Sequence, residues 1–210
     1  MKDLYIIGAG GFCREVAWLV ECINEVSPVW NLKGFIDDNE SIWGSKEDGY
    51  PVLGGCEYLK NMGDVYAVCA VGSAKVRKQI IDKLADSWIK YAALVDPIVI
   101  MSKRVYVGEG SIICAGTIIT VDVTIGRHVI INLDCTLGHD VIKDYVIIYP
   151  SVNVSGNVYI GQMSELGTGV LIIQGKNIVS VTIIGAGAVV ISNIEKSGTY
   201  VGVPIERVDK

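Results

Sequence analysis

A six-residue repeat of apolar residues runs through the second half of the chain and limits its fold more than any other feature. Aliphatic residues recur at every sixth position from Val95 to Leu137 and, after one five-residue step, from Ile142 to Val190. The leading positions are Val95, Met101, Val107, Ile113, Ile119, Ile125, Ile131, Leu137, Ile142, Ile148, Val154, Ile160, Leu166, Ile172, Ile178, Ile184 and Val190. This period fits neither an α-helix, at about 3.6 residues, nor a strand of an open sheet, at about 2. It is typical of a solenoid in which each flat side is one hexad and successive coils stack about 4.8 Å apart.

The repeat also predicts which side chains face the interior. Each leading residue points inward, and so does the residue four positions later, which is small or β-branched. These second positions are Val99, Val105, Ser111, Thr117, Val123, Val129, Cys135 and Val141. Glycine and small polar residues form the corners, where unusual backbone angles are needed. By this register His128 and His139 lie at corners on the surface. We expect residues 92–210 to form a parallel β-helix with a short C-terminal tail.

The first ninety residues follow a different pattern, in which strands alternate with helices. Buried-strand runs cover residues 4–7, 32–36, 65–71 and 89–94, and helical stretches cover residues 12–24 and 74–85. This alternation indicates a parallel α/β sheet. We therefore expect a Rossmann-like domain over residues 1–91 in front of the β-helix.

A glycine-rich loop follows the first strand of this domain. Gly8, Gly10 and Gly11 lie between the strand and a helix, where backbone N–H groups and the helix N-terminus favour a phosphate. Asp37 and Asp38 end the second strand, where a ribose or base contact is expected. Cys13 stands in the last position of the dinucleotide fingerprint, and the domain is short. Binding of a phosphate or a nucleotide is favoured, a dinucleotide is disfavoured, and a tight turn without a ligand is the alternative.

Composition excludes several other functions. The net charge of −5 argues against nucleic acid, which selects basic surfaces. The six cysteines form no C-x-x-C pair, so neither a zinc ribbon nor a redox motif is indicated, and no metal is expected. No apolar run is long enough to span a membrane, and the first residues resemble a strand rather than a signal peptide. We expect a cytoplasmic protein with no membrane partner.

The chemistry is expected at His139, because histidine is the usual general base near neutral pH. Asp140 follows it directly and could orient or charge-stabilise an imidazole. The register places Gly156 in the corner above His139, about one strand spacing away. Its N–H could act as an oxyanion donor toward a thioester carbonyl. An exposed corner histidine without function is the alternative.

Several segments resemble those of a known family. They are 132–140, 154–157, 166–169, 184–189 and 202–204 in the repeat half, with 8–11 and 37–38 in the first domain. Together they resemble the sialic acid O-acetyltransferases and nucleotide-linked 4-amino-sugar N-acetyltransferases. The chain departs from that family at Ile147, where many members carry a second histidine, and at its Pro204-Ile205-Glu206 ending.

This resemblance implies a left-handed β-helix, a homotrimer with active sites between neighbouring subunits, and acetyl-CoA as co-substrate. His139 would take a proton from the sugar amine, Asp140 would orient it, and Gly156 would stabilise the carbonyl. The resemblance places Asn132, Gly8, Gly10, Gly11, Asp37, Asp38 and Ser73 with the nucleotide-linked sugar, and Gly156, Gly167, Thr168, Gly185 and Ala186 with the coenzyme.

The favoured function is N-acetylation of a nucleotide-linked amino sugar, such as a 4-amino-4,6-dideoxy sugar. Three alternatives remain: an O-acetyltransferase acting on sialic acid or a related sugar, a catalytically weakened β-helix that serves as a binding or scaffold protein, and, more remotely, an NAD-dependent dehydrogenase. The five-residue step beside His139 motivates the scaffold alternative.

Overall fold

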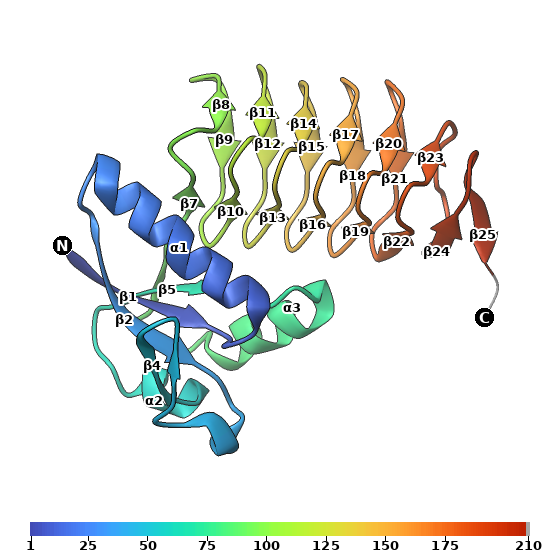
Figure 1. Cartoon of the computed structure of the whole chain (residues 1–210). Helices are drawn as coiled ribbons and strands as arrows, with labels where there is room; N and C mark the ends of the chain where they lie inside the picture. Colours follow the sequence, from blue (N-terminus) through green and yellow to red (C-terminus); the bar gives the residue numbers. More distant parts are fainter. Residues whose placement is uncertain (209–210) are drawn as a thin grey trace. The chain divides into compact units, whose positions relative to one another are not determined.

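The computed structural model describes residues 1–208. The chain forms two compact units, Met1–Pro97 and a second that begins at Ile98 (Figure 1). Among the described residues, no helix is long and apolar enough to cross a membrane.

The N-terminal unit is built on a six-stranded sheet in the order β3-β4-β2-β1-β5-β6. Its strands are β1 (Lys2–Ile7), β2 (Trp30–Ile36), β3 (Lys46–Glu47), β4 (Tyr50–Gly54), β5 (Tyr66–Cys69) and β6 (Lys90–Tyr91). The helices are α1 (Gly11–Val26), α2 (Cys56–Lys60) and α3 (Ala74–Lys83), with a short 3₁₀ turn η1 (Glu40–Ile42). Neighbouring strands run parallel except β3 and β4. The expected α/β domain is confirmed.

Two short strands and a helix of this unit were not foreseen. Strands β3 and β4 form a hairpin around Asp48 and Gly49, whose φ angles are +46° and +85°. An Asp-Gly pair is a typical signal for such a turn, because both central residues need positive φ. Helix α2 has only five residues, too few to show a clear apolar period. The last strand of the unit, β7 (Leu94–Val95), carries the first leading position of the repeat.

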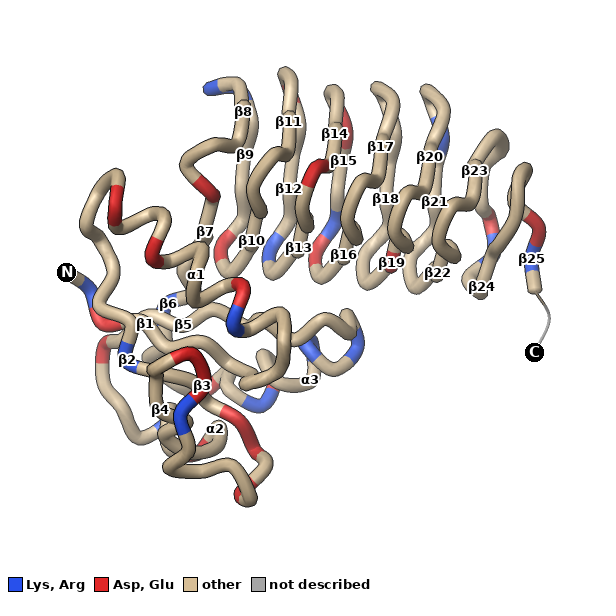
Figure 2. Tube along the Cα trace, viewed as in Figure 1, with Lys and Arg blue, Asp and Glu red and all other residues tan. Residues whose placement is uncertain are grey.

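The second unit is a β-helix with three faces, each built from very short strands. One face holds β10 (Ile112–Ile113), β13 (Ile130–Ile131), β16 (Ile147–Ile148), β19 (Glu165–Leu166), β22 (Thr182–Ile184), β24 (Gly198–Val201) and β25 (Glu206–Val208). The second holds β8 (Ile100–Met101), β11 (Ile118–Ile119), β14 (Thr136–Leu137), β17 (Asn153–Val154), β20 (Leu171–Ile172) and β23 (Val189–Val190). The third holds β9 (Tyr106–Val107), β12 (Thr124–Ile125), β15 (Val141–Ile142), β18 (Tyr159–Ile160) and β21 (Asn177–Ile178). All pairs are parallel except β24 and β25, and the strands carry few charged residues (Figure 2).

The predicted interior is confirmed from Ile113 onward, because every leading residue from there to Val190 is at most 4 % exposed. Met101 differs and is 37 % exposed. It lies on β8, the last strand at its end of the second face, so no coil covers it on one side. Val107, on the end strand of the third face, is half-buried for the same reason.

The five-residue step shortens one coil. Ile125 pairs with Ile142, seventeen residues later, whereas Ile142 pairs with Ile160, eighteen residues later. The missing residue shifts the inward position by one. Val141, expected inside, is 38 % exposed, and the side chain that points inward in its place is that of Asp140, which is fully buried.

The expectation for His128 is also wrong, because its side chain is only 3 % exposed. The imidazole stacks on Tyr145 with ring centres 5.2 Å apart. On its other side lies Gly110, where a Cβ atom would come within 2.3 Å of Nδ1. A glycine on one side and an aromatic ring on the other make room for an enclosed histidine at this corner.

Candidate functional site

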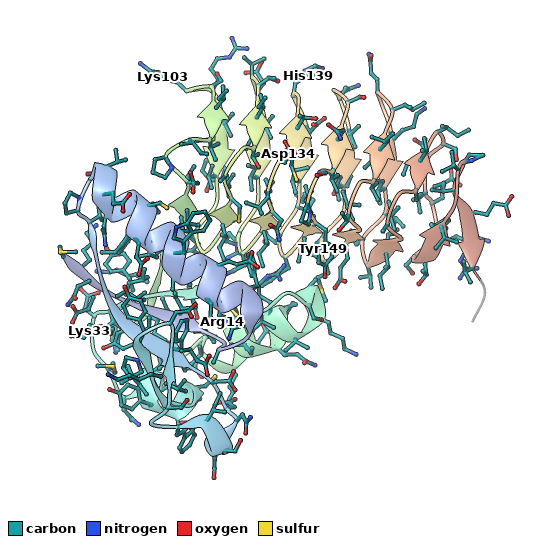
Figure 3. All side chains as sticks on the ribbon, in the orientation of Figure 1. Arg14, Lys33, Lys103, Asp134, His139 and Tyr149 are labelled. Carbon is teal, nitrogen blue, oxygen red and sulfur yellow. The ribbon has the colours of Figure 1, made fainter. Side chains whose placement is uncertain are left out.

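His139 lies at the shortened corner between β14 and β15. Its backbone has a φ of +44°, in the left-handed region, and its side chain is exposed at this edge of the β-helix (Figure 3). The imidazole lies against Gly156 in the next coil, as the register predicts. A Cβ atom at position 156 would come within 2.1 Å of Nε2 and 2.2 Å of Cε1, so only glycine leaves room for the ring.

Asp140 is fully buried beside this corner, and its carboxylate binds the backbone. The N–H of Gly138 donates to Oδ2 at 2.9 Å, and the N–H of Val158 donates to Oδ1 at 2.8 Å. No hydrogen bond joins Asp140 to the His139 imidazole among residues 1–208. Burial raises the pKa of Asp140 to about 6, against the opposing effects of the two N–H donors and of His139.

This raised pKa predicts a pH-dependent stability. The ordinary pKa is 3.8, so the folded chain binds the Asp140 proton more tightly than the unfolded chain does. The stabilisation is full below the ordinary pKa and is lost as the pH rises through 6. A difference of roughly two pKa units corresponds to about 3 kcal/mol. Thermal melts of the wild type and of Asp140→Asn, from about pH 7 to about pH 4, should therefore show the wild type gaining stability relative to the variant. A constant difference between the two would contradict the assigned pKa.

Apart from Gly156, the residues expected to bind the coenzyme lie at a different edge of the β-helix. Gly167 and Gly185 follow β19 and β22 on the first face, with Thr168 and Ala186 next in the chain. Gly167 lies so close to the following coil that a Cβ would come within 2.6 Å of the Ala186 nitrogen. The Gly187 N–H donates to the Thr168 carbonyl at 2.8 Å, and this bond joins the corner at Thr168 to the corner at Gly187 in the next coil.

Asn132 follows β13 at this same edge, and its side chain accepts a hydrogen bond from the Leu133 N–H at 2.7 Å. Tyr149 follows β16 there and lies across the β-helix from His139 (Figure 3). One chain therefore brings together His139, Asp140 and Gly156 at one edge. It brings together Asn132, Gly167, Thr168, Gly185 and Ala186 at another.

The glycine loop of the N-terminal unit has the expected form. Gly8 has a φ of +105°, and Gly10 is the N-terminal cap of α1. A Cβ atom at Gly10 or Gly11 would meet nothing within 4 Å, so the start of the helix is open. Asp37 follows directly after β2 and contacts this loop. The Ala9 N–H donates a hydrogen bond to Asp37 Oδ2 at 3.1 Å.

A crevice of about 300 Å³ lies beside this loop and is lined by Gly8, Asp37, Asp38 and Cys56, with Ile7, Ile36, Val71, Val76 and Ile80. Asp38 accepts hydrogen bonds from the Cys56 N–H at 2.7 Å and from Lys83 at 2.9 Å. The Cys56 N–H and, less strongly, Lys83 lower the pKa of Asp38 against the effect of burial. Ser73 caps α3 by accepting from the Val76 N–H at 3.5 Å, so its hydroxyl already has a structural role.

A second crevice of about 520 Å³ shares Asp38 and was missed by sequence reasoning. Its lining includes Trp43, Tyr58 and Lys83. The indole N–H of Trp43 donates to the Asp37 carbonyl at 2.7 Å, which holds the ring beside the acidic pair. The sequence signal that could have indicated this crevice is the short separation between Trp43 and the Asp37-Asp38 pair.

Comparison with known proteins extends these observations. The family model of the PglD N-terminal domain matches residues 3–84 of this chain. GDP-perosamine N-acetyltransferase of Escherichia coli O157:H7 is 28% identical over 186 residues, which cover 82% of this chain and 79% of that protein. The acetyltransferase domain of PglB from Neisseria gonorrhoeae FA1090, solved with acetyl coenzyme A, is 27% identical with a TM-score of 0.89, over 99% of each chain.

A histidine-to-alanine mutant of GDP-perosamine N-acetyl transferase from Caulobacter crescentus was solved with CoA and GDP-perosamine. It is 25% identical with a TM-score of 0.88, over 100% of this chain and 98% of that one. Over its whole length the chain is similar to hexapeptide-repeat sugar N-acetyltransferases, and its first unit matches the PglD N-terminal domain. The family resemblance and the left-handed β-helix expected from the sequence are thereby confirmed. Within residues 1–208, no group of three or more His, Cys, Asp or Glu could hold a metal ion.

Proposed function

We propose that this chain transfers an acetyl group from acetyl-CoA to the amino group of a nucleotide-linked sugar, such as a 4-amino-4,6-dideoxy sugar. The observation that carries the proposal is the exposed His139 imidazole packed on Gly156 at the shortened corner. The family supports it, because relatives carry the name N-acetyltransferase and were solved with acetyl-CoA or with CoA and a nucleotide amino sugar.

His139 acts as the general base. As the sugar amine attacks the thioester carbonyl, a C–N bond forms and the amine proton moves to the imidazole. The C–S bond then breaks, and the imidazolium returns the proton to the departing thiolate. The Gly156 N–H has no hydrogen-bond acceptor in the described part of the chain, so it can donate to the carbonyl oxygen as negative charge develops there. No acyl-enzyme is needed, since amine and thioester react directly.

A complete site requires a neighbouring subunit in this proposal. The His139 edge and the Asn132 edge are different edges of one β-helix, so residues of both can face one substrate only when two copies meet. A homotrimer supplies three such junctions. Ile100, Ile118 and Leu171 on the second face are 66 %, 39 % and 44 % exposed, and this apolar surface suits subunit contact.

The nucleotide occupies the N-terminal crevice in this proposal. Its phosphates lie at Gly10 and Gly11, where the start of α1 is open, and its nucleoside contacts Asp37 and Asp38. The substrates are cytoplasmic in this account, and six free cysteines suit a reducing compartment.

Nucleotide binding should raise the melting temperature. A diphosphate nucleotide at about 100 times its Kd stabilises the folded state by about 2.7 kcal/mol. We expect one of GDP, UDP and dTDP to raise Tm in a thermal-shift assay, and Asp37→Ala to abolish most of that rise. Asp64→Ala is the matched control, because Asp64 is an exposed carboxylate that pairs with Lys90 outside the crevices. A wild type that responds to no nucleotide, yet acetylates a free sugar, would favour the O-acetyltransferase alternative.

A further inference from the structure

We infer that Asp140 is a positioning residue that repairs the shortened corner through the backbone, and so fixes His139 against Gly156. This assignment rests on the proposed function of His139. It differs from the expected role for an acid beside a histidine, because the carboxylate accepts hydrogen bonds from two main-chain N–H groups and none from the imidazole.

The first of these N–H groups has lost its usual partner. On the same face, the N–H that follows a leading residue donates to the leading carbonyl of the next coil. Thr120 donates to Leu137 at 3.0 Å, and Ser155 donates to Ile172 at 3.0 Å. By this rule Gly138 would donate to Val154. It donates to Asp140 Oδ2 instead, so the carboxylate takes the place of the carbonyl acceptor at this corner.

The second N–H group shows why a carboxylate is needed at this place. At other corners an inward hydroxyl accepts the N–H of the residue eighteen positions later. Ser111 accepts from Val129 at 3.0 Å, and Ser164 accepts from Thr182 at 3.3 Å. Asp140 makes the same contact with Val158 through Oδ1. A hydroxyl at position 140 could serve Val158 but has no second oxygen for the Gly138 N–H.

The two bonds of the Asp140 carboxylate fix the backbone next to His139. At several six-residue corners the residue in the left-handed region donates its own N–H to the preceding coil, as Asp134 does to Ala115 and Gly175 does to Gly156, both at 3.1 Å. Within residues 1–208, the N–H of His139 makes no such bond. The backbone of His139 is therefore held from its two sides, by the Gly138 N–H and by Asp140 itself. The full burial of Asp140 excludes solvent from both bonds.

The test compares Asp140→Val with Ser111→Val. Valine suits the inward position, since Val123 and Val158 occupy it in neighbouring coils. Each substitution removes a buried side chain that accepts the N–H eighteen positions later, but only Asp140→Val also removes the acceptor of the Gly138 N–H beside His139. We expect Asp140→Val to lower kcat on the order of 10²-fold, because a small displacement of a reacting group is this costly. KM for acetyl-CoA should change less than about threefold, as expected when ground-state binding is kept. Ser111→Val should destabilise the fold with kcat within about twofold of the wild type.

A second variant and an NMR measurement keep the inference testable if valine prevents folding or if acetyl transfer proves absent. Asp140→Ser retains the Val158 contact and should selectively lose hydrogen-exchange protection at the Gly138 amide. The imidazole resonances of His139, followed by NMR, should depend on pH in the same way in Asp140→Ser as in the wild type.

A clearly different pH dependence of the His139 imidazole in Asp140→Ser would show that Asp140 acts directly on the ring, and would overturn the inference. Equal kcat losses in Asp140→Val and Ser111→Val, or unchanged Gly138 protection, would also overturn it. A wild type without acetyl transfer would refute the proposed function instead, and the Gly138 and His139 measurements would still decide the role of Asp140.

Discussion

Replacing His139 with alanine should lower kcat for acetyl transfer by about 10²–10⁴-fold, the usual contribution of a general base. The side chain is exposed and makes no hydrogen bond within the described residues, so the fold should not depend on it. Exposed substitutions of this kind change the free energy of unfolding by about 0.5 kcal/mol or less. Steady-state kinetics on the wild type and His139→Ala, with thermal melts of both, measure the two effects.

His139→Asn is the matched variant, because it keeps a polar side chain at the corner but offers no basic nitrogen near neutral pH. Both variants should retain acetyl-CoA binding by calorimetry. A loss smaller than about tenfold in either variant would remove His139 from the role of general base. An inactive wild type that still binds acetyl-CoA would favour the scaffold alternative.

Replacing Gly156 with alanine should reduce activity nearly as much, through displacement of the ring. The added methyl group would lie 2.1 Å from His139 Nε2, closer than real Cβ contacts allow. The imidazole sits at the end of an exposed side chain, so it can rotate away at little cost in stability. We expect kcat to fall on the order of 10²-fold while Tm changes by only a few degrees.

A double-mutant cycle separates this clash from other effects of the methyl group. In a His139→Ala background the ring is gone, so Gly156→Ala should cost little further activity. The coupling between the two positions should then equal most of the loss caused by Gly156→Ala alone. Additive losses would mean that the methyl group blocks substrate or weakens the Gly156 N–H donor, and that the ring contact is incidental.

The arrangement of the β-helix could be predicted because its period depends only on local spacing. A leading aliphatic residue at every sixth position suffices to place Ile113 to Val190 inside. What could not be predicted is how the chain closes a coil that lacks one residue. Counting forward from Leu137 assigns Val141 to the interior. The structure instead turns Asp140 inward, because the missing residue is taken from the corner and the strand register is kept.

The site was only partly predictable for a related reason. Register alone puts Gly156 beside His139, since that relation runs along one edge of the β-helix. His139 and Asn132 lie at different edges, and in the proposed function they meet only across two subunits. No sequence spacing within one chain predicts such a contact. The enclosure of His128 depends on Gly110 and Tyr145 in neighbouring coils, a three-residue contact that no single hexad reveals.

The most direct test of the account is acetyl transfer itself. The wild-type chain should be incubated with acetyl-CoA and GDP-, UDP- or dTDP-linked 4-amino sugars, with CoA thiol release followed over time and the sugar product examined by mass spectrometry. The account predicts release of one CoA for each amide formed on a nucleotide-linked amino sugar, and loss of that release in His139→Ala. Acetylation of a sugar hydroxyl alone, or the same rate in His139→Ala as in the wild type, would contradict it.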